Sequence, residues 1–270
     1  PIDHSLSPTL HEAGYRAAGL DDWSYARAEV VADEVRAFVA RLDHDVVGLS
    51  VTMPCKEAAL AVADEASALA GDVGAANTLV RRDGGWFADN TDVHGVVEAL
   101  RAAGCAGGRG AVVIGSGATA RSVVAALSRL GVREVTFVVR AQARPETLAL
   151  ARSLGMSTRV VREDDEDAAW AVGMALLVVQ TSPAGGADAL AARVVDAPSL
   201  RIGAAGGPFV LDVVYADWPT AFARTMSARG ATVVSGLDML VHQAAAQFEL
   251  FTGHTAPIAD MMEAGRAAVK

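Results

Sequence analysis

Residues 111–120 read AVVIGSGATA, a short apolar run followed directly by a turn rich in glycine. Apolar residues then recur at helical spacing to about Leu130, so the stretch predicts a strand, a tight turn and a helix. The spacing Gly115-x-Gly117-x-x-Ala120 fits the dinucleotide-binding fingerprint. Gly115 allows the tight turn, Gly117 lets the backbone approach a pyrophosphate, and Ala120 lets helix and strand pack closely. Similar turns occur without ligands, but a strand before and a helix after favour a nucleotide site.

The alternation of strands and helices continues on the C-terminal side of this turn. The pattern predicts a helix over 145–154 and further strands over 135–139, 158–161, 175–179 and 209–214. That order is typical of a doubly wound parallel sheet with helices on both faces, a Rossmann-type domain. Two late helices are expected over 236–251 and 258–268.

The first hundred residues have a different pattern. Apolar residues at helical spacing predict helices within 25–40 and 57–69, and residues 46–51 predict a buried strand. Residues 76–80 and 86–88 flank RRDGG, which predicts a hairpin. A helix should begin at Asp92, and the glycine-rich joint 104–110 follows it. We therefore place a domain boundary at this joint and expect an α/β protein of two domains.

Composition excludes several classes of protein. The 270 residues carry a net charge of −9 without a block of Lys or Arg, which argues against nucleic-acid and anionic-membrane partners. Cys55 and Cys105 are too few for a disulfide framework and lack metal-ligand spacing, so no metal is expected. The longest apolar run, 168–179, is too short to span a bilayer. We expect a cytoplasmic protein, with a few residues preceding Pro1.

Lys56 is the only lysine inside the chain. Of 23 basic residues 21 are Arg, and the other lysine is the terminal Lys270. A guanidinium stays protonated in proteins, whereas a lysine amine can give up its proton in a suitable environment. Lys56 therefore stands out as a candidate for acid–base chemistry, and the alternative is an ordinary surface charge.

The residues that follow the second predicted strand of the nucleotide domain should determine whether NAD or NADP binds. NAD enzymes place an acidic residue there, but Val139 is followed by Arg140 and, four residues on, by Arg144. Glu134 lies at the start of the strand, away from the carboxyl ends where ligands bind. Two guanidiniums suit a 2′-phosphate, although both could also be solvated loop residues. The sequence favours NADP.

Polar clusters interrupt apolar surroundings at widely spaced points in the chain. They are Ser5-Leu6-Ser7, residues 50–56 (SVTMPCK), Ala76-Asn77-Thr78, Asp89-Asn90-Thr91-Asp92, Asp212-Val213-Val214-Tyr215 and residues 236–243 (GLDMLVHQ). With PIDHSLSPTLH at residues 1–11, these motifs resemble the shikimate dehydrogenase family, and the resemblance covers the whole chain in order.

The resemblance implies a substrate domain of residues 1–101 plus 237–270 and a nucleotide domain of residues 102–236, with a cleft between them. It also implies that the protein reduces 3-dehydroshikimate to shikimate with NADPH, reversibly, in aromatic amino-acid and chorismate biosynthesis. Hydride would come from nicotinamide C4 and the proton from the catalytic pair Lys56 and Asp92. The positions that match the family's substrate contacts are Ser5, Ser7, Thr52, Asn77, Tyr215 and Gln243. Those expected at the cofactor are Gly115, Gly117, Ala118, Thr119, Ala120, Arg140, Arg144, Thr181, Val213, Gly236 and Met239.

Residue chemistry is compatible with this assignment. Hydroxyl and amide side chains suit a small polyol acid, and no basic residue obviously faces its carboxylate. Lys56 could protonate the nascent alkoxide, with Asp92 orienting the amine. Met239 and Gln243 are four apart, so one helix could touch cofactor and substrate. As alternatives, the Ser5–Ser7 pair could cap a helix, and Asp92 could be an N-cap.

Some positions depart from the family pattern. Ser50 stands where the family often has Asn, Ala118 replaces a usual Gly, and Val139 and Gln180 each replace an Asn. Family members that accept quinate often have Thr at the position of Ser7. A quinate/shikimate dehydrogenase, often NAD-linked and catabolic, is therefore the nearest alternative, and a catalytically silent nucleotide sensor is a more distant one. The partners expected are small molecules, with a monomer or homodimer.

Overall fold

The computed structural model describes residues 2, 5–198 and 207–269 and divides into two compact units. Unit 1 comprises residues 1–95 and 240–270, and unit 2 comprises residues 96–239. These boundaries lie a few residues from those expected, because both fall inside helices. One is α5 (Asp92–Ala102), and the other is α11 (Gly236–Thr252).

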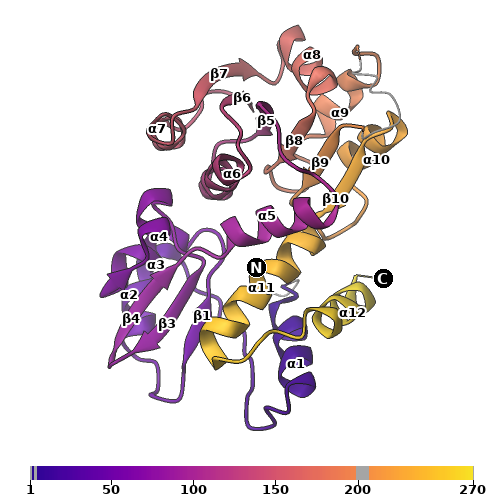
Figure 1. Cartoon of the computed structure of the whole chain (residues 1–270). Coiled ribbons are helices and arrows are strands. Elements are labelled where there is room, and N and C mark those ends of the chain that lie inside the picture. Colours follow the sequence, from indigo (N-terminus) through magenta and orange to yellow (C-terminus); the bar gives the residue numbers. More distant parts are fainter. Residues whose placement is uncertain (1, 3–4, 199–206, 270) are drawn as a thin grey trace. The chain divides into compact units, whose positions relative to one another are not determined.

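Unit 2 is built on a six-stranded parallel sheet (Figure 1). Its strands are β5 (Gly110–Ile114), β6 (Glu134–Val139), β7 (Ser157–Arg162), β8 (Leu177–Gln180), β9 (Phe209–Asp212) and β10 (Thr232–Ser235). The order is β10-β9-β8-β5-β6-β7, so the chain winds outward in both directions from the β5–β8 pair. This is the Rossmann order, and it confirms the predicted fold class.

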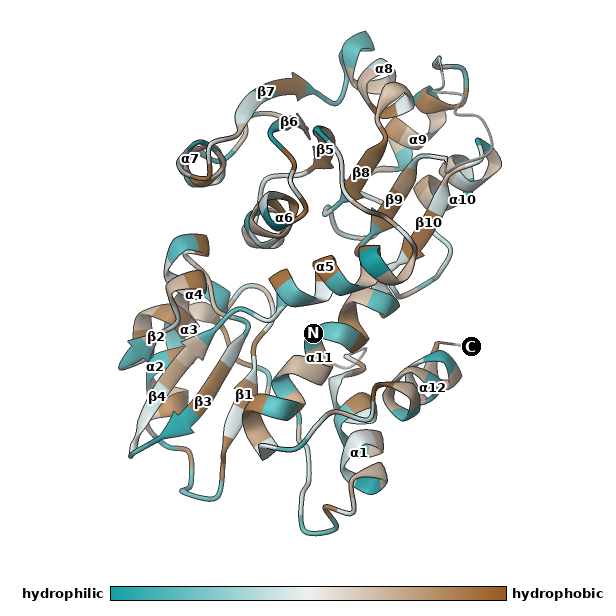
Figure 2. Ribbon diagram, viewed as in Figure 1, coloured by the Kyte–Doolittle hydropathy of each residue, from teal (hydrophilic) through white to brown (hydrophobic). Residues whose placement is uncertain are grey.

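Helices cover both faces of this sheet (Figure 1). Helices α6 (Ala118–Arg129) and α7 (Pro145–Ser153) pack together on one face, and α8 (Glu166–Met174), α9 (Asp188–Val194) and α10 (Ala221–Ala228) cover the other. Strands buried on both faces should be largely apolar, and β8 and β9 are hydrophobic in Figure 2 up to their last residues, Gln180 and Asp212. The core beneath α8–α10 includes Ile114, Val178, Val210, Leu190 and Phe222.

Unit 1 contains a smaller mixed sheet in the order β1-β3-β4-β2. The strands are β1 (Gly48–Ser50), β2 (Glu65–Ala66), β3 (Thr78–Arg82) and β4 (Gly85–Asp89). Strands β3 and β4 form the predicted hairpin, and Asp83 and Gly84 at its turn both have positive φ angles, 46° and 86°. The helices are α1 (Ser7–Ala17), the short η1 (Ala32–Glu34), α2 (Val35–Val39), α3 (Lys56–Val62), α4 (Ala68–Val73) and α12 (Ile258–Ala268), with α1 packed on α12.

Two helix predictions in unit 1 are wrong in part. Within residues 25–40 the chain becomes helical only at Ala32, and residues 24–31 form neither helix nor strand. The helix expected over 57–69 ends at Val62, because the Asp64 carboxylate accepts from the Trp86 backbone N–H at 2.8 Å and ties the chain to β4. Ser67 then begins α4 by accepting from the Ala70 N–H at 3.0 Å. Over the described ranges, helices are too short or too polar to cross a membrane.

Candidate active site

Lys56 and Asp92 form an ion pair in unit 1. Lys56 is the first residue of α3, which follows β1, and Asp92 is the first residue of α5, which follows β4. Lys56 Nζ lies 2.5 Å from Asp92 Oδ2, and the two side chains are only 12% and 7% exposed. The N-terminus of α5 also favours a carboxylate at this position. The pair is therefore held where solvent screens it weakly.

Asn77 connects this pair to a buried hydrogen-bond network. Its Nδ2 lies 2.9 Å from Asp92 Oδ1, 2.9 Å from Thr91 Oγ1 and 3.0 Å from Gln243 Oε1. Its Oδ1 accepts from the Thr91 backbone N–H at 2.8 Å. Both oxygens of Asp92 are thus engaged, one by Lys56 and one by Asn77, so the carboxylate orients the amine instead of serving only as a helix cap. Four predicted residues, Lys56, Asp92, Asn77 and Gln243, meet here.

Gln247 belongs to the same network, and sequence reasoning missed it. This fully buried residue lies one turn after Gln243 on α11. Its Nε2 donates to the Asn77 backbone carbonyl and lies 3.0 Å from Thr78 Oγ1, while its Oε1 accepts from the Ser50 hydroxyl at 2.8 Å. The signal available in the sequence was a second glutamine four residues after the first, on the same face of an apolar helix.

Ser5 and Ser7 lie at the start of α1. The Ser7 backbone N–H donates to Ser5 Oγ at 3.4 Å, but the N-cap of α1 is Leu6 and no side chain caps the helix, so the alternative that these serines are only helix caps is not supported. Arg27 Nη2 donates to the Ser5 carbonyl at 2.7 Å. Arg27 thereby anchors the backbone of residues 5–7, which we call the serine loop. The expectation that no basic residue faces the substrate carboxylate stays a prediction. Thr52 is exposed in the turn between β1 and α3.

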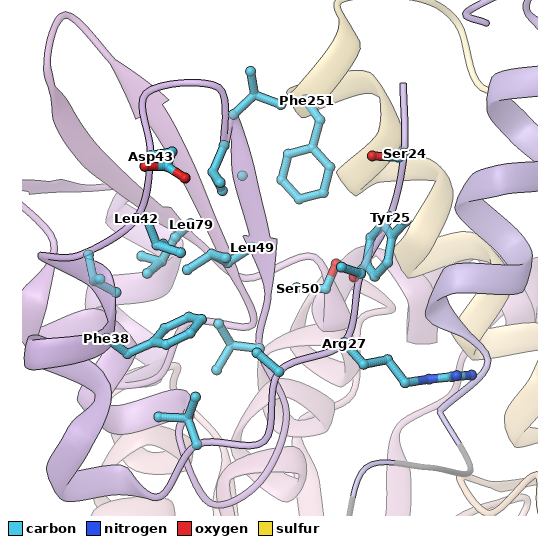
Figure 3. Close-up of a pocket in the computed structure, with 18 of the residues that line it drawn as sticks. Ser24, Tyr25, Arg27, Phe38, Leu42, Asp43, Leu49, Ser50, Leu79 and Phe251 are labelled. Atoms are coloured by element: carbon cyan, nitrogen blue, oxygen red, sulfur yellow. The ribbon is translucent and has the colours of Figure 1, made fainter. Parts of the chain in front are cut away.

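Unit 1 also contains a cavity of about 650 Å³ beside β1 (Figure 3). Apolar side chains form most of its wall, including Phe38, Leu42 and Leu49, with Tyr25 and Ser50 at one side. Among the described residues that line it, Thr52 is the one predicted substrate contact. Ser50 connects this cavity to the network, because it lines the cavity and donates to Gln247. A polyol needs convergent polar partners, which the network provides and the largely apolar cavity wall does not.

The glycine-rich turn of unit 2 has the geometry of a nucleotide site. Gly115 has a φ of 103°, and a Cβ there would lie 2.5 Å from Thr181 Oγ1, so only glycine fits. A Cβ on Gly117 would meet nothing within 4 Å, which leaves open space at the N-terminus of α6. Thr181 Oγ1 donates to the Ile114 carbonyl at 2.7 Å and joins the carboxyl ends of β5 and β8. The turn therefore fits a pyrophosphate.

The predicted phosphate-binding arginines lie beyond the carboxyl end of β6. Arg140 follows β6 directly and is exposed, and Arg144 is the N-cap of α7. The Arg144 backbone N–H donates to Ser116 Oγ at 3.1 Å, which ties this loop to the glycine-rich turn. Glu134, at the opposite end of β6, pairs with Arg109 at 2.7 Å. Ala118 and Thr119 begin α6, and Ala120 is fully buried against the sheet.

The remaining predicted cofactor residues lie around the ends of β9 and β10. A Cβ on Gly236 would lie 2.2 Å from the Val213 carbonyl, so a side chain there would clash with the backbone. Burial raises the pKa of Asp212, whose carboxylate accepts from the Thr220 hydroxyl at 2.6 Å and from the Val214 N–H at 3.1 Å. Asp212 therefore shapes the loop that carries Val213 and Tyr215. Met239 is buried on α11.

The part of the chain that the structure describes shows no group of three or more His, Cys, Asp or Glu placed to hold a metal ion. Cys55 and Cys105 are buried free thiols, and burial raises the pKa of each.

Comparison with known families gives two matches at the two ends of the chain. Residues 1–79 match the shikimate dehydrogenase substrate binding domain, and residues 236–264 match the shikimate 5′-dehydrogenase C-terminal domain. A shikimate dehydrogenase (NADP(+)) from Caulobacter vibrioides is 39% identical over 94% of this chain and 87% of its own.

Solved structures give the same result. Shikimate dehydrogenase from Mycobacterium tuberculosis has a TM-score of 0.87 and 43% identity, covering 99% of this chain and 96% of its own. Shikimate 5-dehydrogenase from Thermus thermophilus, solved with NADP(H) and shikimate, has a TM-score of 0.82 and 32% identity, with the same coverage.

Proposed function

Because this chain belongs to the shikimate dehydrogenase family, we propose that it catalyses the reversible reduction of 3-dehydroshikimate to shikimate with NADPH. The observation that carries the proposal is the buried Lys56–Asp92 pair within a network of amides and hydroxyls. A ketone reduction needs a proton for the oxygen that becomes an alkoxide, and a charged lysine amine can supply it. A nucleotide-sensing protein without catalysis would not need this pair.

Each residue of the network has a distinct role in this proposal. Lys56 donates its proton to the nascent alkoxide in reduction and accepts it back in oxidation. Asp92 holds the amine in place and stabilises its charge, while Asn77 fixes Asp92 through Oδ1. Asn77 and Gln243 also provide amide groups for the ring hydroxyls, to which Thr52 adds its hydroxyl. Ser5, Ser7 and Tyr215 provide hydroxyl donors for the carboxylate.

NADP binds unit 2 in this proposal, and its nicotinamide supplies the hydride. The pyrophosphate is held by the turn from Gly115 to Ala120, where Gly117 leaves room for it. Arg140 and Arg144 hold the 2′-phosphate, for which planar guanidiniums are well suited. Thr181, Val213, Gly236 and Met239 line the rest of the cofactor site.

Initial rates test the proposed reaction directly. Purified protein should reduce NADP⁺ with shikimate and oxidise NADPH with 3-dehydroshikimate, and a Lys56→Ala variant should do neither at a comparable rate. Protein that binds NADP⁺ but turns over neither acid would contradict the proposal and favour a silent sensor. The cytoplasmic location and the monomeric or homodimeric state remain predictions, and light scattering after size-exclusion chromatography would measure the second.

A further inference from the structure

The amide of Gln247 fixes the direction of its hydrogen bond with Ser50. Its Nε2 donates to the Asn77 backbone carbonyl, a group that can only accept. Its Oε1 must therefore face Ser50, and the Ser50 hydroxyl donates to it at 2.8 Å. With its single proton used in this way, Ser50 can only accept from any further hydroxyl group.

Tyr25 is the residue that meets Ser50 from the other side. The two side chains point toward each other in Figure 3, at one side of the cavity. Burial raises the pKa of Tyr25, and hydrogen bonds of its hydroxyl with Ser50 and Ser7 partly offset that rise. The phenol therefore stays protonated and has one proton to share between two serine oxygens. Its ring is fixed by stacking on His11, with ring centroids 4.7 Å apart.

Arg27 supports the serine loop two residues further along the chain. Its guanidinium donates to the Ser5 carbonyl at 2.7 Å. Tyr25 stacks on His11, which lies one turn after Ser7 on α1, and this stacking places the tyrosine beside Ser7, with which its hydroxyl interacts. The segment 24–31, which has no helix or strand of its own, thus contacts both serines expected to hold the substrate carboxylate.

From this arrangement we propose that Tyr25 is a positioning residue for the carboxylate end of the substrate, acting through Ser7. When a substrate carboxylate accepts a hydrogen bond from the Ser7 hydroxyl, the Ser7 oxygen can still accept one. The Tyr25 hydroxyl then reorients and donates its hydrogen bond to the Ser7 oxygen. A hydroxyl that accepts a hydrogen bond is a stronger donor, so Tyr25 strengthens the bond from Ser7 to the anion. Ser50 cannot take over this role, because its hydroxyl already donates its one hydrogen bond to Gln247 Oε1. The inference rests on the proposed function.

Tyr25→Phe tests this role, because it removes only the hydroxyl and keeps the ring on His11. The KM for shikimate should rise about three- to tenfold, with kcat within about twofold of wild type and the KM for NADP⁺ unchanged. Tyr15→Phe is the matched control, a buried tyrosine in the same aromatic cluster, and should leave all three parameters unchanged. Thermal unfolding of both variants checks that the fold is kept.

A double-mutant cycle separates positioning from a purely structural effect. If Tyr25 acts through Ser7, the Tyr25→Phe/Ser7→Ala double variant should be no worse than Ser7→Ala alone. With the primary amide of shikimate, which lacks the anionic carboxylate, Tyr25→Phe should change KM by less than twofold. An unchanged KM for shikimate in Tyr25→Phe, or losses that multiply in the double variant, would overturn the inference. The proposed function fails separately, if the wild-type protein does not oxidise shikimate at all.

Discussion

At the scale of single residues, the ion pair between Lys56 Nζ and Asp92 Oδ2, 2.5 Å apart, predicts how the activity of mutants should change. Lys56→Ala removes the proton donor, so kcat should fall by roughly 10²–10⁴-fold, the usual contribution of general acid–base catalysis. KM should change much less, because the loss is mainly in the transition state. Asp92→Asn should lower kcat in the same way, since the amine loses the carboxylate that orients it.

Loss of stability has to be excluded in that experiment. Removing Lys56 leaves the largely buried Asp92 with Asn77 as its remaining partner described above, and breaking a buried pair is costly. Lys56→Gln keeps an N–H donor for Asp92 but has no proton to transfer, so it should fold better than Lys56→Ala and be equally inactive. A folded Lys56→Ala protein with more than about half of the wild-type kcat would refute the catalytic assignment.

Arg140 is the residue that should discriminate between the two nicotinamide cofactors. Charge-assisted hydrogen bonds to a phosphate are each worth roughly 1.5–3 kcal/mol, so Arg140→Ala should weaken NADP⁺ binding by about 10–100-fold. NAD⁺ lacks the 2′-phosphate and should bind almost as before. Arg152→Ala, which removes an exposed arginine of α7, is the control for general charge effects. Equal losses for both cofactors, measured by fluorescence titration, would mean that Arg140 supports the loop and does not read the phosphate.

At the scale of elements, periodicity predicted those segments whose own residues decide the structure. Helices α6, α11 and α12 lie where apolar residues recur at helical spacing, and the parallel strands β5 to β9 follow short apolar runs. Helices α8, α9 and α10 and strand β10 were not predicted. Strand β10 has only four residues and exists through its pairing with β9, a partner more than twenty residues away that local pattern does not reveal.

Some residues of the polar network could likewise be predicted from the sequence, and others could not. Lys56, Asp92, Asn77 and Gln243 stand out as polar residues in apolar surroundings, and the structure brings them together. Gln247 and Tyr25 were missed, because their importance lies in partners distant in the sequence. Tyr25 also lies in a segment whose apolar spacing wrongly indicated a helix.

Helix α1 carries a buried titratable group that should make stability depend on pH. His11 is fully buried among aromatic rings, and burial lowers its pKa from 6.5 to about 4. The unfolded chain therefore binds a proton between pH 6.5 and about 4 while the folded chain does not, so stability is greatest above pH 6.5 and falls as the pH is lowered. At pH 5 the cost is on the order of 2 kcal/mol, since one pKa unit corresponds to about 1.4 kcal/mol.

Urea unfolding at pH 7.5 and pH 5 tests this dependence. His11→Phe keeps an aromatic ring in the cluster and removes the titration, so the drop in unfolding free energy between the two pH values should be smaller in the variant by about that amount. Other groups titrate equally in both proteins and cancel in the difference. The same pH dependence in wild type and variant would contradict the role of His11.

At the scale of the whole molecule, unit 2 is an insertion within the sequence of unit 1. Residues 96–239 leave unit 1 within α5 and return within α11, so both connections are continuous helices. Asp92 begins the first of these helices, and Gln243 and Gln247 lie on the second. Each connecting helix therefore carries part of the polar network in unit 1.

Substrate preference is the property of the whole enzyme that distinguishes a shikimate dehydrogenase from a quinate/shikimate dehydrogenase. Shikimate and quinate both carry a carboxylate, but quinate has an extra hydroxyl on a tetrahedral C1, whereas C1 of shikimate is planar. Ser5 and Ser7 are the residues expected at that end, and in the proposed site the hydroxyl of Ser7 would be committed to the carboxylate and Tyr25. The added hydroxyl would then be buried without a partner, which costs roughly 1–3 kcal/mol.

That cost sets the preference to be expected in kinetics. The kcat/KM for shikimate with NADP⁺ should exceed that for quinate by about 5–150-fold. Ser7→Thr should narrow the shikimate-to-quinate ratio if position 7 carries the discrimination, because the added methyl group changes the shape of the site at C1 and the direction in which the hydroxyl donates. Comparable kcat/KM values for the two acids in the wild-type enzyme would move the chain to the quinate/shikimate class. A clear preference that Ser7→Thr leaves unchanged would instead place the discrimination on other residues around the carboxylate, of which Tyr25 and Arg27 are the first to substitute.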